Sequence, residues 1–131
     1  MTLVYTPLYA FFLTLLYLLL SFMVIRGRWK YRTALGEGTE ETMQKLVRIH
    51  GNFSEYVPLG LILLLLAELQ NAPANFLHWC GGFLLAGRIG HVFGLLKSRE
   101  TSLGRIGGML LTFLSLALLM GYQVYAFQFQ F

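Results

Sequence analysis

The residues best suited to do chemistry are Arg48, Asn52 and Glu55, a base, an amide and an acid that precede the apolar run 57–67. If this stretch is helical, spacings of four and three residues place all three side chains on one face. Ionisable side chains are costly at membrane depth and usually face a protein interior or a water-filled cavity. The stripe therefore predicts either a binding site or charges that neutralise one another, and the spacing favours neither.

Further polar residues are expected at the same ends of the predicted helices. The full candidate set is Arg28, Arg48, His50, Asn52, Glu55, Arg88, His91 and Arg105. Arginines can hold carboxylates through two parallel hydrogen bonds, and Glu55 can pair with an amine, so the set suits a small anionic ligand with one ammonium group. Neutralisation of Glu55 by Arg48 or Arg88 between helices explains the same residues equally well.

The elements that must position these residues are membrane helices. The 131 residues are 56% hydrophobic and only 12% charged, and the mean hydropathy is +0.63. This is too apolar for a soluble domain, and the length allows four spans of about 20 residues each. We expect one all-α transmembrane domain over residues 1–131, a four-helix bundle with helices at about 3–25, 40–70, 75–96 and 102–127, and with Pro58 inside the second helix.

The net charge of +4 comes from basic residues that gather around two connections. They are Arg26, Arg28, Lys30, Arg32, Lys45 and Arg48 around the first connection, and Arg88, Lys97, Arg99 and Arg105 around the third. The positive-inside rule places these two loops in the cytoplasm and both termini on the other side. The same placement argues against a nucleic-acid partner. The first apolar run has no basic segment before it, so we expect a retained helix and not a cleaved signal peptide.

Several features have predominantly structural explanations. The segment 26–39 alternates bases with aromatic residues, which suits a lipid-headgroup anchor and a ligand-binding loop equally. A stripe of small residues is expected to let another helix approach closely; it consists of Gly82, Ala86, Gly90 and Gly94. Cys80 is the single cysteine, so an intramolecular disulfide is excluded and a buried position is expected. No metal site is predicted, because His50 and His91 stand on different helices without thiolates or an HExxH spacing.

Taken together, the motifs resemble a known family. The block Arg48-x-His50-x-Asn52-x-x-Glu55-Tyr56-x-Pro58 is followed by Gly87-Arg88-x-x-His91 and by a basic residue that opens the last helix. This pattern resembles the MAPEG family, the membrane-associated proteins in eicosanoid and glutathione metabolism. The resemblance covers about residues 28–119, and the short connections are similar to those of bacterial members.

The resemblance implies a left-handed four-helix protomer that assembles as a homotrimer in a bacterial inner membrane, with glutathione between subunits near the cytoplasmic face. It implies glutathione contacts from Arg48, Asn52, Glu55 and Tyr56, with Glu55 at the amino group. His50 matches a polar contact, Arg28 a carboxylate-binding arginine of the first loop, and Arg88 and His91 third-helix site positions. Arg105 matches the catalytic arginine that stabilises the thiolate, if one loop residue is inserted.

The expected function is therefore a glutathione-dependent transferase or peroxidase that detoxifies lipophilic electrophiles or peroxides arriving from the membrane lipids. Eukaryotic members carry tyrosines where this chain has Leu95 and Met109, so part of the ligand's support differs and its consequence for activity is open. The alternatives are a four-helix small-molecule exporter, which typically needs an acid deep in a helix, and a non-catalytic lipid-binding or thiol-binding protein.

Overall fold

The computed structural model describes residues 2–97 and 100–129, and the predicted cytoplasmic position of Arg99 falls outside these ranges. The described residues form four helices and no strands: α1 (Tyr5–Tyr31), α2 (Glu41–Leu69), α3 (Ala74–Lys97) and α4 (Leu103–Phe129). Each helix is long and apolar enough to cross a membrane. The predicted all-α fold with four membrane-spanning helices is confirmed.

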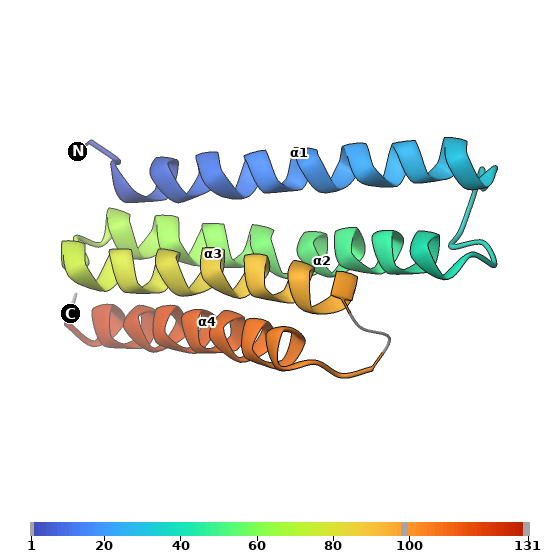
Figure 1. The fold of residues 1–131 in the computed structure, drawn as a ribbon. Helices are drawn as coiled ribbons and strands as arrows, with labels where there is room; N and C mark the ends of the chain where they lie inside the picture. The colour runs from blue at the N-terminus through green and yellow to red at the C-terminus, as the bar shows by residue number, and fades with distance from the viewer. Residues whose placement is uncertain (1, 98–99, 130–131) are drawn as a thin grey trace.

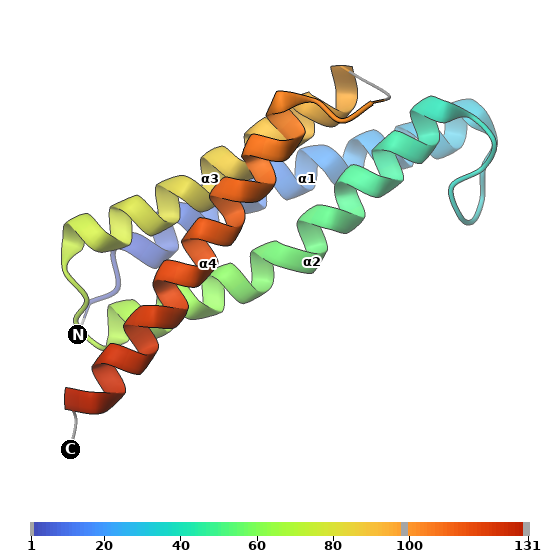
Figure 2. The ribbon, with the colours of Figure 1, turned by 90° about the horizontal axis from the view of Figure 1, so that it is seen from below.

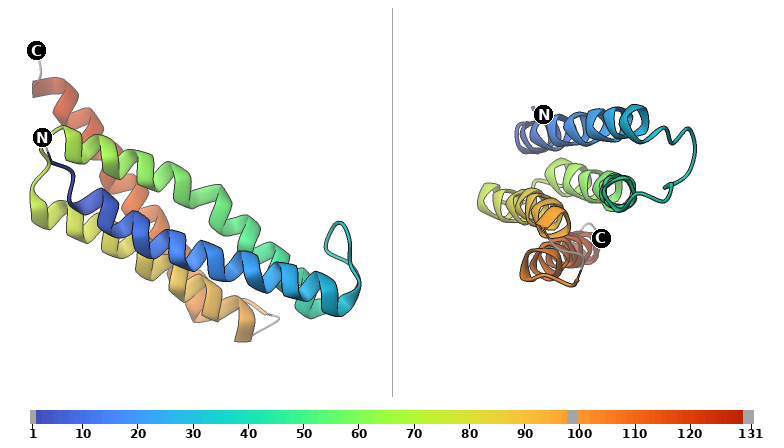
Figure 3. Two further views of the ribbon diagram at one scale, coloured as in Figure 1. Left: turned by 90° about the horizontal axis from the view of Figure 1, so that it is seen from above. Right: turned by 45° about the vertical axis from the view of Figure 1, so that its right-hand side comes forward.

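The helices run alternately up and down, so the beginning of α1 and the end of α4 lie at the same end of the bundle (Figure 1). We call this the terminal end, and we call the opposite end, with residues 32–40 and the α3–α4 connection, the basic end. Figures 2 and 3 show α2 and α3 between α1 on one side and α4 on the other. Accordingly α1 contacts α2 and α3, and α4 contacts α3 and α2, but α1 and α4 do not meet within the described residues.

The first helix is longer than predicted. Instead of ending at Ile25 it continues to Tyr31, and Arg32 ends it in the left-handed conformation with φ 51°. Gly27 does not break the helix because it is buried against α2, where a Cβ atom would lie 2.9 Å from the sulfur of Met43. The loop predicted from Arg26 onwards is therefore wrong at its start, and the connection spans residues 32–40.

Helices α3 and α4 form the closest pair in the bundle, as glycines on both helices allow. A Cβ atom at Gly87 would lie 2.7 Å from the carbonyl oxygen of Gly108, and one at Gly90 would lie 3.5 Å from that of Gly104. At Gly94 a Cβ atom would overlap the backbone of Arg105. The predicted packing stripe is thus right at Gly90 and Gly94.

The prediction is wrong for the other two residues, Gly82 and Ala86, which do not pack against α4. Ala86 is exposed, and the nearest atom to a Cβ at Gly82 is the hydroxyl of Tyr9 on α1, 3.9 Å away. The face of α3 against α4 follows spacings of three and four through residues 87, 90 and 94, because successive residues in a helix turn by about 100°.

The terminal end contains a contact that the sequence did not reveal. The carboxylate of Glu68, which is 5% exposed, accepts backbone hydrogen bonds from Val4 at 2.6 Å, Tyr5 at 2.9 Å and Thr6 at 2.6 Å. The first N–H groups of a helix have no partner within the helix and attract anions. Glu68 on α2 therefore caps α1 across more than 60 residues of chain. Cys80, as predicted, is fully buried.

Candidate functional site

A polar network joins three helices in the interior near the basic end. Arg88 on α3 is 1% exposed, and its Nη1 atom donates to Oδ1 of Asn52 on α2 at 2.6 Å. Its Nε and Nη2 atoms donate to Oγ1 of Thr112 on α4 at 3.1 and 2.7 Å. The sulfur of Met109 accepts a further bond from Nη2 at 3.3 Å. These acceptors are uncharged, and within residues 2–97 and 100–129 no carboxylate forms an ion pair with Arg88, so dipoles stabilise its charge.

The ring of Tyr56 completes the surroundings of Arg88. The ring centroid lies 5.6 Å from the guanidinium carbon, within the range of a cation–π contact. The Tyr56 ring also meets Phe113 of α4 edge to face, with the ring centroids 5.6 Å apart. Tyr56, predicted as a ligand contact, therefore lies between α2 and α4 beside the buried arginine.

His91 lies one turn from Arg88 on α3, and it is 5% exposed. Its backbone packs directly against α4, where a Cβ atom at Gly108 would lie 2.5 Å from the His91 nitrogen. Three of the predicted site residues, Asn52, Arg88 and His91, are thus interior residues within one protomer. They help to hold the helices together beneath the exposed side chains Arg48 and Glu55.

A polar pocket of about 500 Å³ lies at the basic end, one to two helical turns beyond this network. It is lined by Glu37, Thr39, Glu41, Gln44, Lys45, Arg48, Leu95 and Arg105. Arg48 comes from α2 and Arg105 from the first turn of α4, so the fold brings two predicted site arginines to one cavity. The acids Glu37 and Glu41 share its wall, and Glu41 pairs with Lys45 at 3.0 Å.

The start of α4 is fixed where Arg105 stands. The hydroxyl of Ser102 accepts a bond from the Arg105 backbone N–H at 3.3 Å and donates to the carbonyl oxygen of Gly94 at 2.9 Å. Ser102 is thus an N-cap that also joins the two helices. The positive end of the α4 dipole and the guanidinium of Arg105 both favour an anion near this turn.

Glu55 does not line the pocket in a single protomer. It lies 4.0 Å from Arg48, and the two side chains are 54% and 61% exposed. Such an exposed pair is weakly bound because solvent screens the attraction and both side chains remain mobile. Arg48 and Glu55 therefore remain accessible to further partners on the surface of α2.

Two predicted site residues bond elsewhere: Arg28 is part of the last turn of α1, and His50 on α2 bonds α1. The Nη1 atom of Arg28 donates to the carbonyl oxygens of Thr33, Ala34 and Gly36 at 3.2, 3.5 and 3.1 Å, so it orders the α1–α2 connection. The Nε2 atom of His50 lies 3.0 Å from Oγ of Ser21. Neither residue lines the pocket of Arg48 and Arg105.

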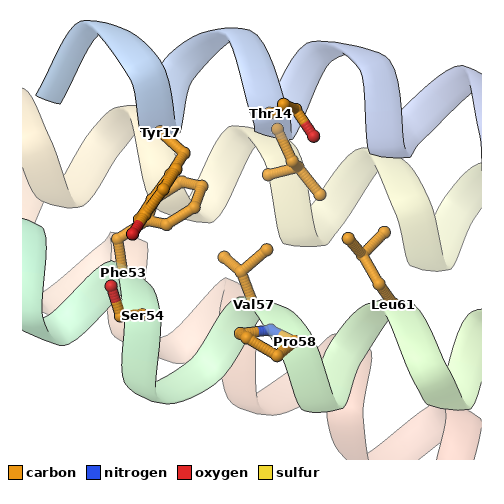
Figure 4. A pocket seen from close by; sticks show the side chains of 8 residues that line it. Thr14, Tyr17, Phe53, Ser54, Val57, Pro58 and Leu61 are labelled. Atoms are coloured by element: carbon orange, nitrogen blue, oxygen red, sulfur yellow. The ribbon is translucent and has the colours of Figure 1, made fainter. Parts of the chain in front are cut away.

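A second, apolar groove of about 280 Å³ lies between α1 and α2. Its lining residues are Leu13, Thr14, Tyr17, Phe53, Ser54, Val57, Pro58 and Leu61. Figure 4 shows the hydroxyl groups of Tyr17 and Ser54 at the same end, with Val57, Pro58 and Leu61 along the rest. None of these residues lines the polar pocket, so the two cavities are separate within a protomer.

The sequence reading missed Thr112 and Ser102, whose hydroxyls connect α4 to α3. Their signal was weak, because serine and threonine are common in membrane helices and no spacing distinguishes these two.

The two positions at which eukaryotic members carry tyrosines lie close to the site: Leu95 lines the pocket, and Met109 contacts Arg88. Among residues 2–97 and 100–129, no three His, Cys, Asp or Glu side chains gather in a way that could hold a metal ion.

Comparison with known proteins identifies the family. The MAPEG family profile matches residues 6–125. Inner membrane protein YecN of Escherichia coli K12 is 43% identical over 89 residues, which cover 68% of each chain. The YecN protein of Escherichia coli O6:H1 strain CFT073 shows the same identity and coverage. The match of the family profile over nearly the whole chain and the similarity to YecN show that this protein is a multi-pass membrane protein that belongs to the MAPEG family.

Proposed function

We propose that this protein is a glutathione-dependent membrane transferase or peroxidase that acts on lipophilic electrophiles. The observation that carries the proposal is that Arg48 and Arg105, from different helices, line one polar pocket of about 500 Å³. Pockets of this size accommodate small-molecule ligands. Guanidinium groups bind carboxylates strongly, and glutathione has two carboxylates and one amine.

Arg105 is the proposed catalytic residue. A free thiol has a pKa of about 8.5, and a fixed positive charge at a helix N-terminus lowers that pKa and raises the thiolate fraction. In conjugation the thiolate sulfur forms a bond to an electrophilic carbon, whose leaving group departs with the electron pair. In peroxide reduction two glutathione molecules are oxidised to the disulfide, while the peroxide is reduced to an alcohol and water.

The proposed assembly is a homotrimer with the ligand between subunits. The exposed pair Arg48 and Glu55 supports this, because both side chains are available to a ligand or to a second copy of the chain. In such an assembly Glu55 would meet the amine of glutathione. The acids Glu37 and Glu41, already in the pocket wall, offer an alternative partner for that amine.

The proposed location is a bacterial inner membrane, as for the relative, inner membrane protein YecN. The basic end, with the pocket, is proposed to face the cytoplasm, as the positive-inside rule predicts. Glutathione is abundant in that compartment. Lipophilic co-substrates and membrane lipids would reach the protomer from the bilayer, where the apolar groove between α1 and α2 is accessible.

The exporter alternative receives no support from the acids of the described helices. Glu68, a buried acid at the end of α2, is engaged by three backbone N–H groups at the start of α1, and Glu55 lies at the surface beside Arg48. A coupling carboxylate must bind and release protons or substrate during transport, whereas Glu68 holds a helix end. A non-catalytic role in lipid binding would need phospholipid to occupy the pocket in place of a thiol.

The direct test is glutathione titration of the purified protein in detergent, followed by the ultraviolet absorbance of bound thiolate. Arg105→Ala should remove the thiolate absorbance and leave the oligomer intact. Arg26→Ala is the matched control, because Arg26 is exposed on α1 outside the pocket lining. Absence of glutathione binding to the wild-type protein at millimolar concentration would rule out the proposal, and retained phospholipid that no thiol displaces would favour the lipid-binding account.

A further inference from the structure

Thr112 is a fully buried polar residue whose hydroxyl makes every hydrogen bond that its geometry allows. The side chain is 0% exposed. Its Oγ1 atom donates to the carbonyl oxygen of Gly108 at 2.8 Å and accepts from the Nε and Nη2 atoms of Arg88 at 3.1 and 2.7 Å. A hydroxyl has one donor and two acceptor positions, and all three are used here.

Thr112 and Arg105 lie on the same face of α4. They are seven residues apart, which is two helical turns, or about 10 Å along the helix axis. Gly108, between them, packs against the backbone of Gly87 and His91 on α3. This face of α4 therefore meets α3 at Arg105, Gly108 and Thr112. Thr112, the residue furthest from the basic end, adds a side-chain hydrogen bond to that contact.

The bond from Thr112 continues to α2. Arg88 also binds Asn52 at 2.6 Å, and Asn52 stands one helical turn from Arg48 on the same face of α2. The chain of contacts from Thr112 through Arg88 to Asn52 thus joins the two helices that supply Arg105 and Arg48. It lies in the interior, where the bonds are shielded from water.

We propose that Thr112 is a positioning residue: through Arg88 it fixes the place of α4, and with it the guanidinium of Arg105, opposite Arg48 across the pocket. This rests on the proposed thiolate-stabilising role of Arg105. Ser102 and Ser115 also bond α4 to α3, but each binds only a backbone carbonyl oxygen of α3. Thr112 instead accepts from the side chain of Arg88, which at the same time binds Asn52 on α2. The Thr112 hydroxyl therefore links α4 to both α2 and α3 through one buried guanidinium, which also donates to the sulfur of Met109 one turn away on α4.

The test compares Thr112→Val, which removes the hydroxyl at nearly constant volume, with Thr112→Ser, which keeps it. Ser115→Ala is the matched control, because Ser115 is also fully buried and its hydroxyl bonds the carbonyl oxygen of Cys80 at 2.8 Å, further from the pocket. In the glutathione-bound protein, Thr112→Val should raise the pH midpoint of thiolate formation by about one unit, equivalent to a tenfold loss of the thiolate at a given pH. kcat should fall while KM changes by less than about twofold.

Thr112→Ser and Ser115→Ala should keep the wild-type midpoint. An equal shift in Thr112→Ser, or an equal shift in Ser115→Ala, would overturn the positioning role, because the hydroxyl at residue 112 would then not be the cause. An unchanged midpoint in Thr112→Val would likewise overturn it. If Thr112→Val does not fold, Thr112→Ala, which also lacks the hydroxyl, takes its place in both the midpoint and the exchange measurements.

Hydrogen exchange without ligand separates this inference from the proposed function. The backbone amides of residues 103–108 should exchange about tenfold faster in Thr112→Val than in Ser115→Ala, as expected for a helix turn that has lost its tertiary anchor. If the wild-type protein does not bind glutathione but this difference is found, the proposed function fails and the positioning role stands. If exchange is the same in both variants, the positioning role fails whatever the ligand.

Discussion

The Nη1 atom of Arg88 donates a 2.6 Å hydrogen bond to the Oδ1 atom of Asn52, and this bond joins α3 to α2 in the protein interior. Asn52 shares a helix face with Arg48 and Glu55, yet it is 8% exposed whereas the other two side chains are more than half exposed. A stripe on one helix face thus divides into an inner residue that stabilises the bundle and outer residues available to a ligand.

Asn52→Ala should destabilise the protein by about 1.5–3 kcal/mol, because it removes an acceptor from a buried charged donor. Urea unfolding of the detergent-solubilised protein measures the change. Ser54→Ala is the control, since Ser54 is an exposed residue of the same helix. Equal midpoints for the two variants would show that the bond to Arg88 contributes little.

The cap formed by Glu68 predicts a local effect at the terminal end. Glu68→Ala should lower stability by about 1–3 kcal/mol, because three backbone N–H groups of α1 lose their buried acceptor. Hydrogen exchange should increase at residues 4–6 and remain unchanged at the basic end of α1. Glu68→Gln should have a smaller effect, because its amide oxygen can still accept one or two of the bonds. Unchanged exchange in Glu68→Ala would contradict the role of this carboxylate as a helix cap.

The neighbouring glycines 107 and 108 offer a matched pair on α4. Gly108→Ala should cost about 1–3 kcal/mol, because its Cβ would lie 2.5 Å from backbone atoms of Gly87 and His91. A Cβ at Gly107 meets nothing within 4 Å, so Gly107→Ala should stabilise α4 by about 0.5–1 kcal/mol through its better helix propensity. Thermal unfolding of both variants gives the comparison, and a stable Gly108→Ala protein would show that α3 and α4 can separate at little cost.

His50 has two competing roles: the family resemblance implies a contact with glutathione, whereas in the protomer it bonds α1. Its imidazole bonds Ser21 on α1 at 3.0 Å, so His50→Ala should lower stability by about 1 kcal/mol and change glutathione affinity by less than about twofold. Arg48→Ala should weaken binding by about tenfold or more, as expected for loss of a charged hydrogen bond. Calorimetric titration of the two variants decides between them. An equal loss of affinity would place His50 in the site formed by the assembled subunits.

The sequence by itself determined the class, an all-α membrane protein with four membrane-spanning helices. Runs of apolar residues longer than a bilayer span can form only membrane helices in such a short chain, and the clustering of basic residues around two connections identified the two loops at one end. The spacing of Arg48, Asn52 and Glu55 correctly indicated a common helix face. The family followed from the motif of the second helix, and the profile match confirms it.

The tertiary structure decided which polar residues are buried and which remain accessible. Periodicity gives the direction of a side chain on its own helix, but not the identity of the neighbour that covers it. The close approach of α3 and α4 made Arg88 an interior residue bound to Asn52 and Thr112, and the packing of α1 on α2 directed His50 to Ser21. Contacts between distant segments, such as Glu68 with the start of α1, depend on how helices pack and leave no periodic signal in the sequence.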